Sequence, residues 1–168
     1  MFEESSRDRL KKMPLFKKAL EIMEISLKIS ESVSMQDIEN LSEAEGSLLE
    51  GYAQYIRENA TIIPAKISGA EAVEIYYLKM ENATIIRKAA RELSTYCSGL
   101  AMCGYKNTDY LQLLRDEVEE FRVLFAEWVK TFDQWDYIID RWGMFNPPGI
   151  DYNTHDPDDD IPFDRDEL

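Results

Sequence analysis

Residues 111–142 read LQLLRDEVEEFRVLFAEWVKTFDQWDYIIDRW and hold the longest regular apolar pattern in the chain. Apolar residues recur there at alternating steps of three and four, at Leu111, Leu114, Val118, Phe121, Phe125, Trp128, Phe132, Trp135, Ile139 and Trp142. Such spacing places side chains on one face of an α-helix. The pattern predicts a single helix over 111–142, about 50 Å long at the usual rise per residue. Asn107 or Thr108 can cap its start, and Gly143 with Pro147-Pro148 can end it.

Three further amphipathic segments precede this one. The first spans 15–33 and can begin at Pro14, because proline is tolerated in the first turn of a helix. The second ends near Gly69 and follows Ser42, which has a glutamate three residues later, as in a capping box; Pro64 predicts a kink or break inside it. The third spans about 70–103 and stops at Gly104. Its apolar face is predicted to contain Tyr76, Met80, Ala83, Ile86, Ala90, Leu93, Cys97 and Leu100.

Four helices with short connections predict an all-α chain folded as an antiparallel up-down four-helix bundle with a long fourth helix and an irregular acidic C-terminal tail. The chain divides into a charged leader (1–13), the bundle (14–145) and an acidic, proline-containing tail (146–168). Because the fourth helix is predicted to outrun the others, its aromatic end needs a cover, from the segment 145–152, from a second chain or from both. The predicted interface residues are therefore Trp128, Phe132, Trp135, Ile139 and Trp142.

The charge of the chain is concentrated at one end. The net charge is −14 over 168 residues, with 33 acidic and 19 basic side chains. Residues 151–168 contain eight acids and one arginine, so half of the net charge lies in this short segment. A nonspecific nucleic-acid binder needs a concentrated basic face to displace counterions. Direct contact with nucleic acid is therefore disfavoured.

Within the tail, three consecutive acids precede a short apolar group: Asp158, Asp159, Asp160, Ile161, Pro162 and Phe163. This segment resembles the acidic tail tip of bacterial single-stranded-DNA-binding proteins, although five residues follow Phe163 here. The resemblance implies a partner-binding motif for a basic, apolar groove on another protein. The alternative is a solubilising terminus in which the apolar residues have no role.

Metal and nucleophile chemistry find little support in the sequence. The only histidine, His155, lies in the acidic tail, so paired Glu-x-x-His motifs, zinc sites and imidazole-assisted nucleophiles are not predicted. The remaining enzyme-like pattern pairs Glu117 with Glu120 and Asp133 with Asp136. Helical pyrophosphohydrolases use similar carboxylate pairs to hold Mg²⁺, but they take them from facing helices. On one predicted helix these pairs are about 24 Å apart, so a solvated face is the stronger interpretation.

Neither a targeting segment nor a membrane-spanning run is predicted. Cys97 and Cys103 are six residues apart on one predicted helix and cannot pair without breaking it. Two reduced thiols predict a cytoplasmic protein.

One segment of the chain resembles a stretch near the end of the second helix in the rRNA intervening-sequence four-helix-bundle family: Ile63-Pro64-Ala65-Lys66-Ile67-Ser68-Gly69. This group includes the accessory proteins of diversity-generating retroelements. The family's first helix is matched by residues 16–22 and its fourth helix by residues 110–132. Its third helix and the following turn are matched by residues 90–93 and 104–105. The resemblance spans about 15–132; Lys66 replaces the family's asparagine. It implies a bundle without catalytic residues that assembles into a ring-like homo-oligomer. The family's RNA-binding role, which uses basic surface, is not carried over.

The sequence therefore predicts a non-enzymatic four-helix-bundle module, without cofactor or metal, that forms a homo-oligomer or binds a protein partner. Two alternatives remain open at this point. One is a small Mg²⁺-dependent nucleotide pyrophosphohydrolase that uses the two carboxylate pairs. The other is an adaptor that recruits a basic DNA-processing partner through its acidic tail.

Overall fold

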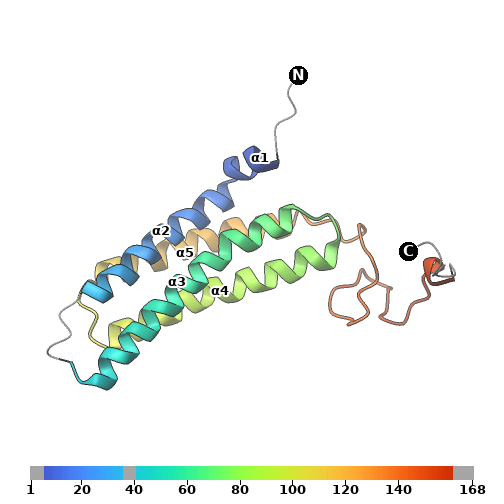
Figure 1. The fold of residues 1–168 in the computed structure, drawn as a ribbon. Helices are drawn as coiled ribbons and strands as arrows, with labels where there is room; N and C mark the ends of the chain where they lie inside the picture. The colour runs from blue at the N-terminus through green and yellow to red at the C-terminus, as the bar shows by residue number, and fades with distance from the viewer. Residues whose placement is uncertain (1–5, 36–40, 161–168) are drawn as a thin grey trace, which may run out of the picture.

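The structure is a computed structural model that describes residues 6–35 and 41–160. This part of the chain is all-helical, without a β-strand, and contains four long helices (Figure 1). None of these helices combines the length and the apolar character that crossing a membrane requires. The elements are α1 (Ser6–Lys12), α2 (Pro14–Met35), α3 (Glu43–Glu71), α4 (Tyr76–Met102), α5 (Thr108–Val129) and the 3₁₀-helix η1 (Pro157–Asp160).

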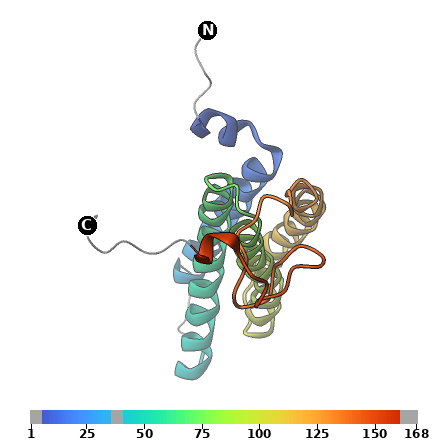
Figure 2. The ribbon, with the colours of Figure 1, turned by 90° about the vertical axis from the view of Figure 1, so that its right-hand side faces the viewer.

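The four long helices pack in a closed set of pairs. Helix α3 lies beside α2 and α4, and α5 also lies beside α2 and α4. The short α1 contacts α2 near the start of the chain. Residues 130–160, which we call the C-terminal extension, run beyond the end of these helices (Figures 1 and 2).

One apolar core joins all four long helices. Each helix contributes fully buried aliphatic side chains, among them Ile22, Ile56 and Ile86, while α5 adds Phe121. The predicted apolar face of the third segment is confirmed from Ala83 onward, at Ala83, Ile86, Ala90, Leu93, Cys97 and Leu100. Burial of this surface is the main favourable term in folding.

The predicted start of the second long helix is confirmed. The Ser42 side chain accepts from the backbone N–H of Glu45, and the Glu45 carboxylate accepts from the backbone N–H of Ser42 at 2.9 Å. This reciprocal pair satisfies two backbone donors at the helix start. Pro64 does not break α3, which continues through it to Glu71. The Ser68 hydroxyl donates to the carbonyl of Pro64 at 3.0 Å, so side chains share in the hydrogen bonding near the proline.

Helix α4 begins later than predicted and ends where predicted. A turn at 72–75 separates it from α3, which continues past the predicted end at Gly69 to Glu71. At the other end, Gly104 has φ +86°, a conformation that favours glycine. The Tyr105 N–H reaches the Leu100 carbonyl at 3.0 Å and the Gly104 N–H reaches that of Ala101 at 3.3 Å, which is a Schellman motif.

The predicted helix over 111–142 is wrong beyond Val129, where α5 ends. Two side chains compete there with the helical ladder. The hydroxyl of Thr131 donates to the Trp128 carbonyl at 2.6 Å, and the carboxylate of Asp133 accepts the Trp135 N–H at 2.9 Å. Such local side-chain bonds stabilise turns over helix. The apolar repeat continues to Trp142, but the backbone that carries it is no longer helical.

Candidate protein-binding site

The C-terminal extension is attached to the helices at the end where α4 begins. Helix α4 has no side-chain cap at Ile75, but the Tyr76 N–H donates to the carbonyl of Asp136 at 2.8 Å. One of the backbone donors left open at a helix start is thereby satisfied by the extension. Phe132 packs edge-on against Trp128 with ring centroids 4.7 Å apart, and the ammonium of Lys79 lies 5.4 Å from the Phe132 ring centre. Backbone and aromatic contacts together hold the first part of the extension against the helices.

Asp140 organises the next turn of the extension. Its carboxylate, 7% exposed as a residue, accepts the backbone N–H groups of Trp142, Met144 and Phe145 at 2.9, 2.9 and 3.0 Å. These bonds, led by that from Phe145, hold the pKa of Asp140 below its usual range. The Asn146 side chain completes the turn by accepting from the Asp140 N–H and donating to its carbonyl. A buried carboxylate with three amide donors is a fixed point in an otherwise irregular segment.

Arg141 closes the extension on itself. Its guanidinium donates to the carbonyls of Tyr152 and Thr154 at 3.0 and 2.9 Å and to the Asp159 carboxylate at 2.6 Å. Three acceptors from residues 152–159 therefore meet on one side chain. The planar guanidinium suits such multiple recognition.

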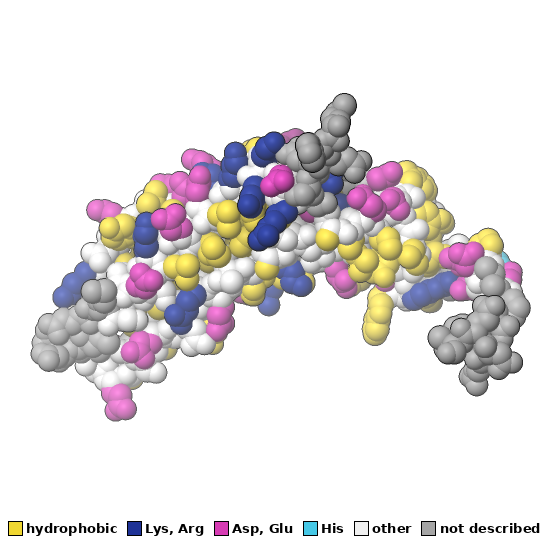
Figure 3. All heavy atoms as spheres, turned by 45° about the horizontal axis from the view of Figure 1, so that its top comes forward, with side chains coloured by type: hydrophobic (Ala, Val, Ile, Leu, Met, Phe, Trp, Pro, Cys, Tyr) yellow, Lys and Arg dark blue, Asp and Glu magenta, His cyan; other side chains and the backbone are white. Residues whose placement is uncertain are grey.

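This ordered segment exposes large apolar side chains. Trp142 is 92% exposed and Met144 71%, and more than half of the surface of three others is open to solvent: Trp135, Ile138 and Tyr152. In Figure 3, hydrophobic side chains gather at the right-hand end of the molecule, where the extension lies. An exposed apolar surface held in a defined backbone conformation is typical of a protein interaction site. We call these five side chains the apolar cluster.

The structure divides the five predicted interface residues into two groups. Trp128 and Ile139 are buried within the chain, and Phe132 is partly buried against the core. Trp135 and Trp142 lie on the surface. The predicted cover from segment 145–152 leaves Trp142 open to solvent, although Tyr152 of that segment lies near Gly143.

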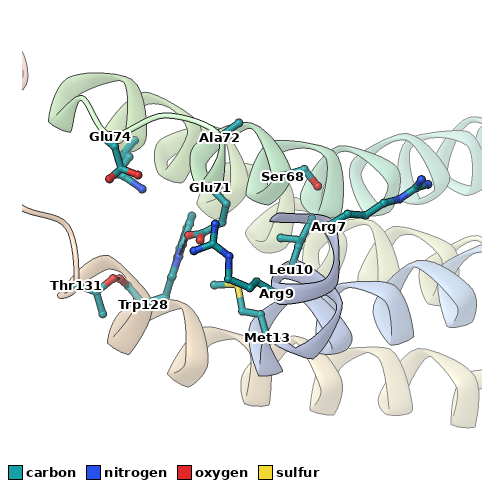
Figure 4. Close-up of a pocket in the computed structure, with 11 residues that line it drawn as sticks. Arg7, Arg9, Leu10, Met13, Ser68, Glu71, Ala72, Glu74, Trp128 and Thr131 are labelled. Atoms are coloured by element: carbon teal, nitrogen blue, oxygen red, sulfur yellow. Dashed lines mark hydrogen bonds between the residues drawn. The ribbon is translucent and has the colours of Figure 1, made fainter. Parts of the chain in front are cut away.

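A hollow of about 850 Å³ lies beside the base of the extension, between α1, the end of α3 and α5 (Figure 4). The indole N–H of Trp128 donates to the Glu71 carboxylate at 2.8 Å in its wall. Arg7, Arg9 and Lys79 line it together with Glu71 and other residues, so both signs of charge meet there. The mixed charges of the hollow do not select one class of ligand. The apolar cluster is therefore the stronger candidate site.

The carboxylates considered for Mg²⁺ hold a lysine instead. The ammonium of Lys18 on α2 lies against the carboxylates of Glu117, Glu120 and Glu21, with the latter two at 2.7 and 2.9 Å. The hydrogen bond that Lys18 donates to Glu117 is the largest of the effects that raise the pKa of Lys18 above its usual range. A cation built into the protein thus occupies the position between the first carboxylate pair. Asp133 and Asp136 lie outside α5, and the described residues contain no cluster of three or more ligands suited to a metal ion.

The remaining predicted groups lie apart from each other. Cys97 and Cys103 are both free, and burial raises the pKa of the Cys97 thiol to about 11, which makes it a poor nucleophile. His155 is exposed and lies 3.0 Å from the Asp160 carboxylate. Of the predicted partner-binding segment, Asp158, Asp159 and Asp160 form the exposed end of η1. Ile161, Pro162 and Phe163 lie outside the described residues.

Sequence analysis missed Asp140, Ile138 and Met144. A signal for the turn was present in residues 140–149, DRWGMFNPPG, which combine an aspartate, an asparagine, two prolines and two glycines. Such residues predict turns rather than helix. The apolar repeat through Trp142 outweighed this signal.

No family model matches the chain, and neither the curated proteins nor the solved structures compared with it give a match.

Proposed function

We propose that the chain is a non-enzymatic module that self-associates through the apolar cluster of its C-terminal extension. Its structural unit is an antiparallel up-down four-helix bundle formed by α2 to α5. The pairwise packing of the helices and the short connections at 72–75 and 103–107 support this unit. The extension then serves as the binding element and the helices as its support.

The observation that carries the proposal is that hydrogen bonds fix the backbone of the extension while its large apolar side chains remain exposed to solvent. Asp140 and Arg141 fix the extension through at least three hydrogen bonds each, and Trp142, directly after them, is 92% exposed. Ordering irregular backbone costs about 1–2 kcal/mol per residue, and a chain gains little from ordering a segment that keeps its tryptophan in water. A second copy that covers the cluster would recover the apolar burial, at about 25 cal/mol per Å².

An oligomeric module also agrees with the resemblance to the rRNA intervening-sequence family over about 15–132, which implies a homo-oligomer without catalytic residues. The segment that carries most of that resemblance lies within α3, at Pro64. Membership of that family, like a cytoplasmic location, stays a prediction.

The pyrophosphohydrolase alternative is weakened by Lys18. A metal ion between Glu117 and Glu120 would have to displace an ammonium that already neutralises these carboxylates. The Lys18 ammonium already balances part of the negative charge of these carboxylates, so the arrangement does not need a metal ion.

The test is the solution mass of the double variant Trp135→Ser/Trp142→Ser beside a matched control. The control, Leu48→Ser/Met102→Ser, removes two exposed apolar side chains from α3 and α4 instead. We expect the tryptophan variant to sediment as a 19.6 kDa monomer at concentrations where the control remains associated. Equal association of both variants would contradict the proposed role of the cluster.

A further inference from the structure

A groove between α4 and α5 combines an apolar floor with a basic rim. Ala90, Val118 and Phe121 are buried and form its floor with Phe125, and the groove encloses about 260 Å³. The rim carries three guanidinium groups, those of Arg87, Arg91 and Arg122. The chain as a whole has a net charge of −14, so the groove gathers basic side chains on an otherwise acidic protein.

Two of these arginines have no counter-ion among the residues that the structure describes. Arg87 and Arg91 are exposed and one turn apart on α4, and their guanidinium groups make no hydrogen bond or ion pair within residues 6–35 and 41–160. Like charges at this spacing disfavour the helix. The third arginine, Arg122, is held by Glu119 through bonds of 2.8 and 3.0 Å. The groove therefore offers two free guanidinium groups beside buried aromatic surface.

We infer that this groove binds the acidic tail segment 156–168 of a second copy of the chain, which rests on the self-association proposed above. The segment places Asp158, Asp159 and Asp160 directly before Ile161 and Phe163. Carboxylates suit the guanidinium groups of the rim, since arginine binds them in bidentate geometry. The apolar pair suits a floor formed by Val118, Phe121 and Phe125.

The geometry of one chain points to a second copy as the source of the segment. The C-terminal extension carries η1 beyond the end of the long helices (Figures 1 and 2). The groove is instead lined by residues 87–94 of α4 and 118–125 of α5. Within the extension, Arg141 holds Asp159 at 2.6 Å. Docking onto the groove of the same chain would require this contact to open. A second copy can approach with the turn intact, since the Asp158 carboxylate makes no hydrogen bond or ion pair within the described residues.

The inference is tested with a fluorescein-labelled peptide of sequence DPDDDIPFDRDEL, residues 156–168, titrated with the full-length chain and followed by fluorescence anisotropy. We expect saturable binding that weakens as salt rises from 50 to about 200 mM, because exposed ion pairs are screened. The double variant Arg87→Glu/Arg91→Glu should lose about tenfold or more in affinity. A peptide with Ile161→Ser and Phe163→Ser should also bind more weakly at unchanged charge.

The matched control is Arg57→Glu/Lys106→Glu, which makes the same change in net charge at exposed sites on α3 and in the turn before α5. Its affinity for the peptide should stay within about twofold of that of the parent chain, because the change in net charge alone has only a small general effect. Equal losses in both variants would mean that the peptide responds only to overall charge and would overturn the site. Absence of saturable binding to the parent chain would overturn it as well.

A second measurement does not depend on how the variants fold. A peptide with benzoylphenylalanine in place of Phe163 should photo-crosslink to residues 87–94 of α4 or 118–125 of α5, as identified by mass spectrometry. Cross-links confined to other helices would contradict the groove.

Peptide binding separates this inference from the proposed function. The Trp135→Ser/Trp142→Ser chain should keep its affinity for the peptide, measured at chain concentrations below the Kd of the peptide, where its own tail leaves it monomeric. If the parent chain stays monomeric at concentrations well above the measured Kd of the peptide, the second copy is the wrong occupant. If the parent chain associates but Arg87→Glu/Arg91→Glu leaves peptide affinity intact, the groove fails and the apolar cluster stands.

Discussion

The indole Nε1 of Trp128 donates a hydrogen bond to Oε1 of Glu71 at 2.8 Å, which joins the last turn of α5 to the last turn of α3. Trp128 also packs between Phe125 and Phe132, with ring centroids 5.9 and 4.7 Å away. The end of α5 and the first residues of the C-terminal extension are therefore fixed through one side chain. Trp142, which continues the same apolar repeat, has no such environment.

Replacement of these two tryptophans should have opposite consequences for folding and for association. We expect Trp128→Ala to lower the free energy of unfolding by about 3–5 kcal/mol, as for other large side chains deleted from a core. Trp142→Ala should change the unfolding free energy by no more than about 0.5 kcal/mol in the monomer. Urea denaturation measures both free energies of unfolding, at a protein concentration too low for the chain to associate. Similar losses in the two variants would contradict the division between core and surface.

Two helical glycines form a matched pair. A Cβ at Gly51 of α3 would meet nothing within 4 Å, whereas one at Gly99 of α4 would lie 2.8 Å from ring atoms of Tyr52. We expect Gly51→Ala to stabilise the fold by about 0.5–1 kcal/mol, because alanine loses less entropy in a helix. Gly99→Ala should instead destabilise it by about 1 kcal/mol or more, since Tyr52 has to move.

Thermal unfolding of both glycine variants at one protein concentration checks this pair. Opposite shifts of Tm relative to the parent chain are the expected result. A stabilising Gly99→Ala would show that α3 and α4 do not approach as closely as Tyr52 and Gly99 indicate.

Asp140 should make the extension sensitive to acid. Because its pKa is lowered in the folded chain, its contribution to stability is present above the usual aspartate range and is lost as the pH falls through the lowered value. Asp140→Asn retains a single acceptor oxygen and so cannot serve Trp142, Met144 and Phe145 as the carboxylate does. We expect a local loss of about 1–3 kcal/mol.

Amide hydrogen exchange at residues 142–146 measures the effect of this substitution. Protection should fall in Asp140→Asn while it persists at Ile56 and Ile86 in the core. Unchanged protection at 142–146 would exclude the carboxylate as the centre of the turn.

The contacts of Lys18 should have the opposite pH dependence. Its pKa is raised by Glu117 first, then Glu120, so the stabilisation is fully present below the usual lysine range and is lost as the pH rises through the higher folded value. Lys18→Met leaves three carboxylates close together without their cation. We expect it to cost about 1–2 kcal/mol at pH 7, less than a buried pair would, because Glu120 is largely exposed.

Denaturation at pH 7 and pH 5 compares Lys18→Met with the parent chain. The difference should persist at both, because both pH values lie below the usual lysine range, where the contribution of Lys18 is fully present. Glu24→Gln, which removes an exposed pair with Lys28, is the control and should have little effect at either pH. A larger effect for Glu24→Gln would contradict the role given to Lys18.

Much of the helical core could be predicted because its apolar residues recur at the three-and-four spacing of an α-helix. Ser42 with Glu45, the face from Ala83 to Leu100 and the stop at Gly104 each depend on residues close in sequence. The end of α5 could not be read from the same period, because Thr131 and Asp133 decide it through local bonds that leave the apolar spacing unchanged. The role of Lys18 depends on the packing of α2 against α5, about 100 residues away in sequence. The residues around Lys18 do not predict this contact.

The most direct test of self-association is the mass of the full-length parent chain, measured by sedimentation equilibrium from about 1 to 100 μM, a range that spans interfaces of moderate affinity. The apolar cluster predicts a mass that reaches at least twice 19.6 kDa within this range and returns to 19.6 kDa in Trp135→Ser/Trp142→Ser. A parent chain that remains at 19.6 kDa across the whole range would contradict the proposed function.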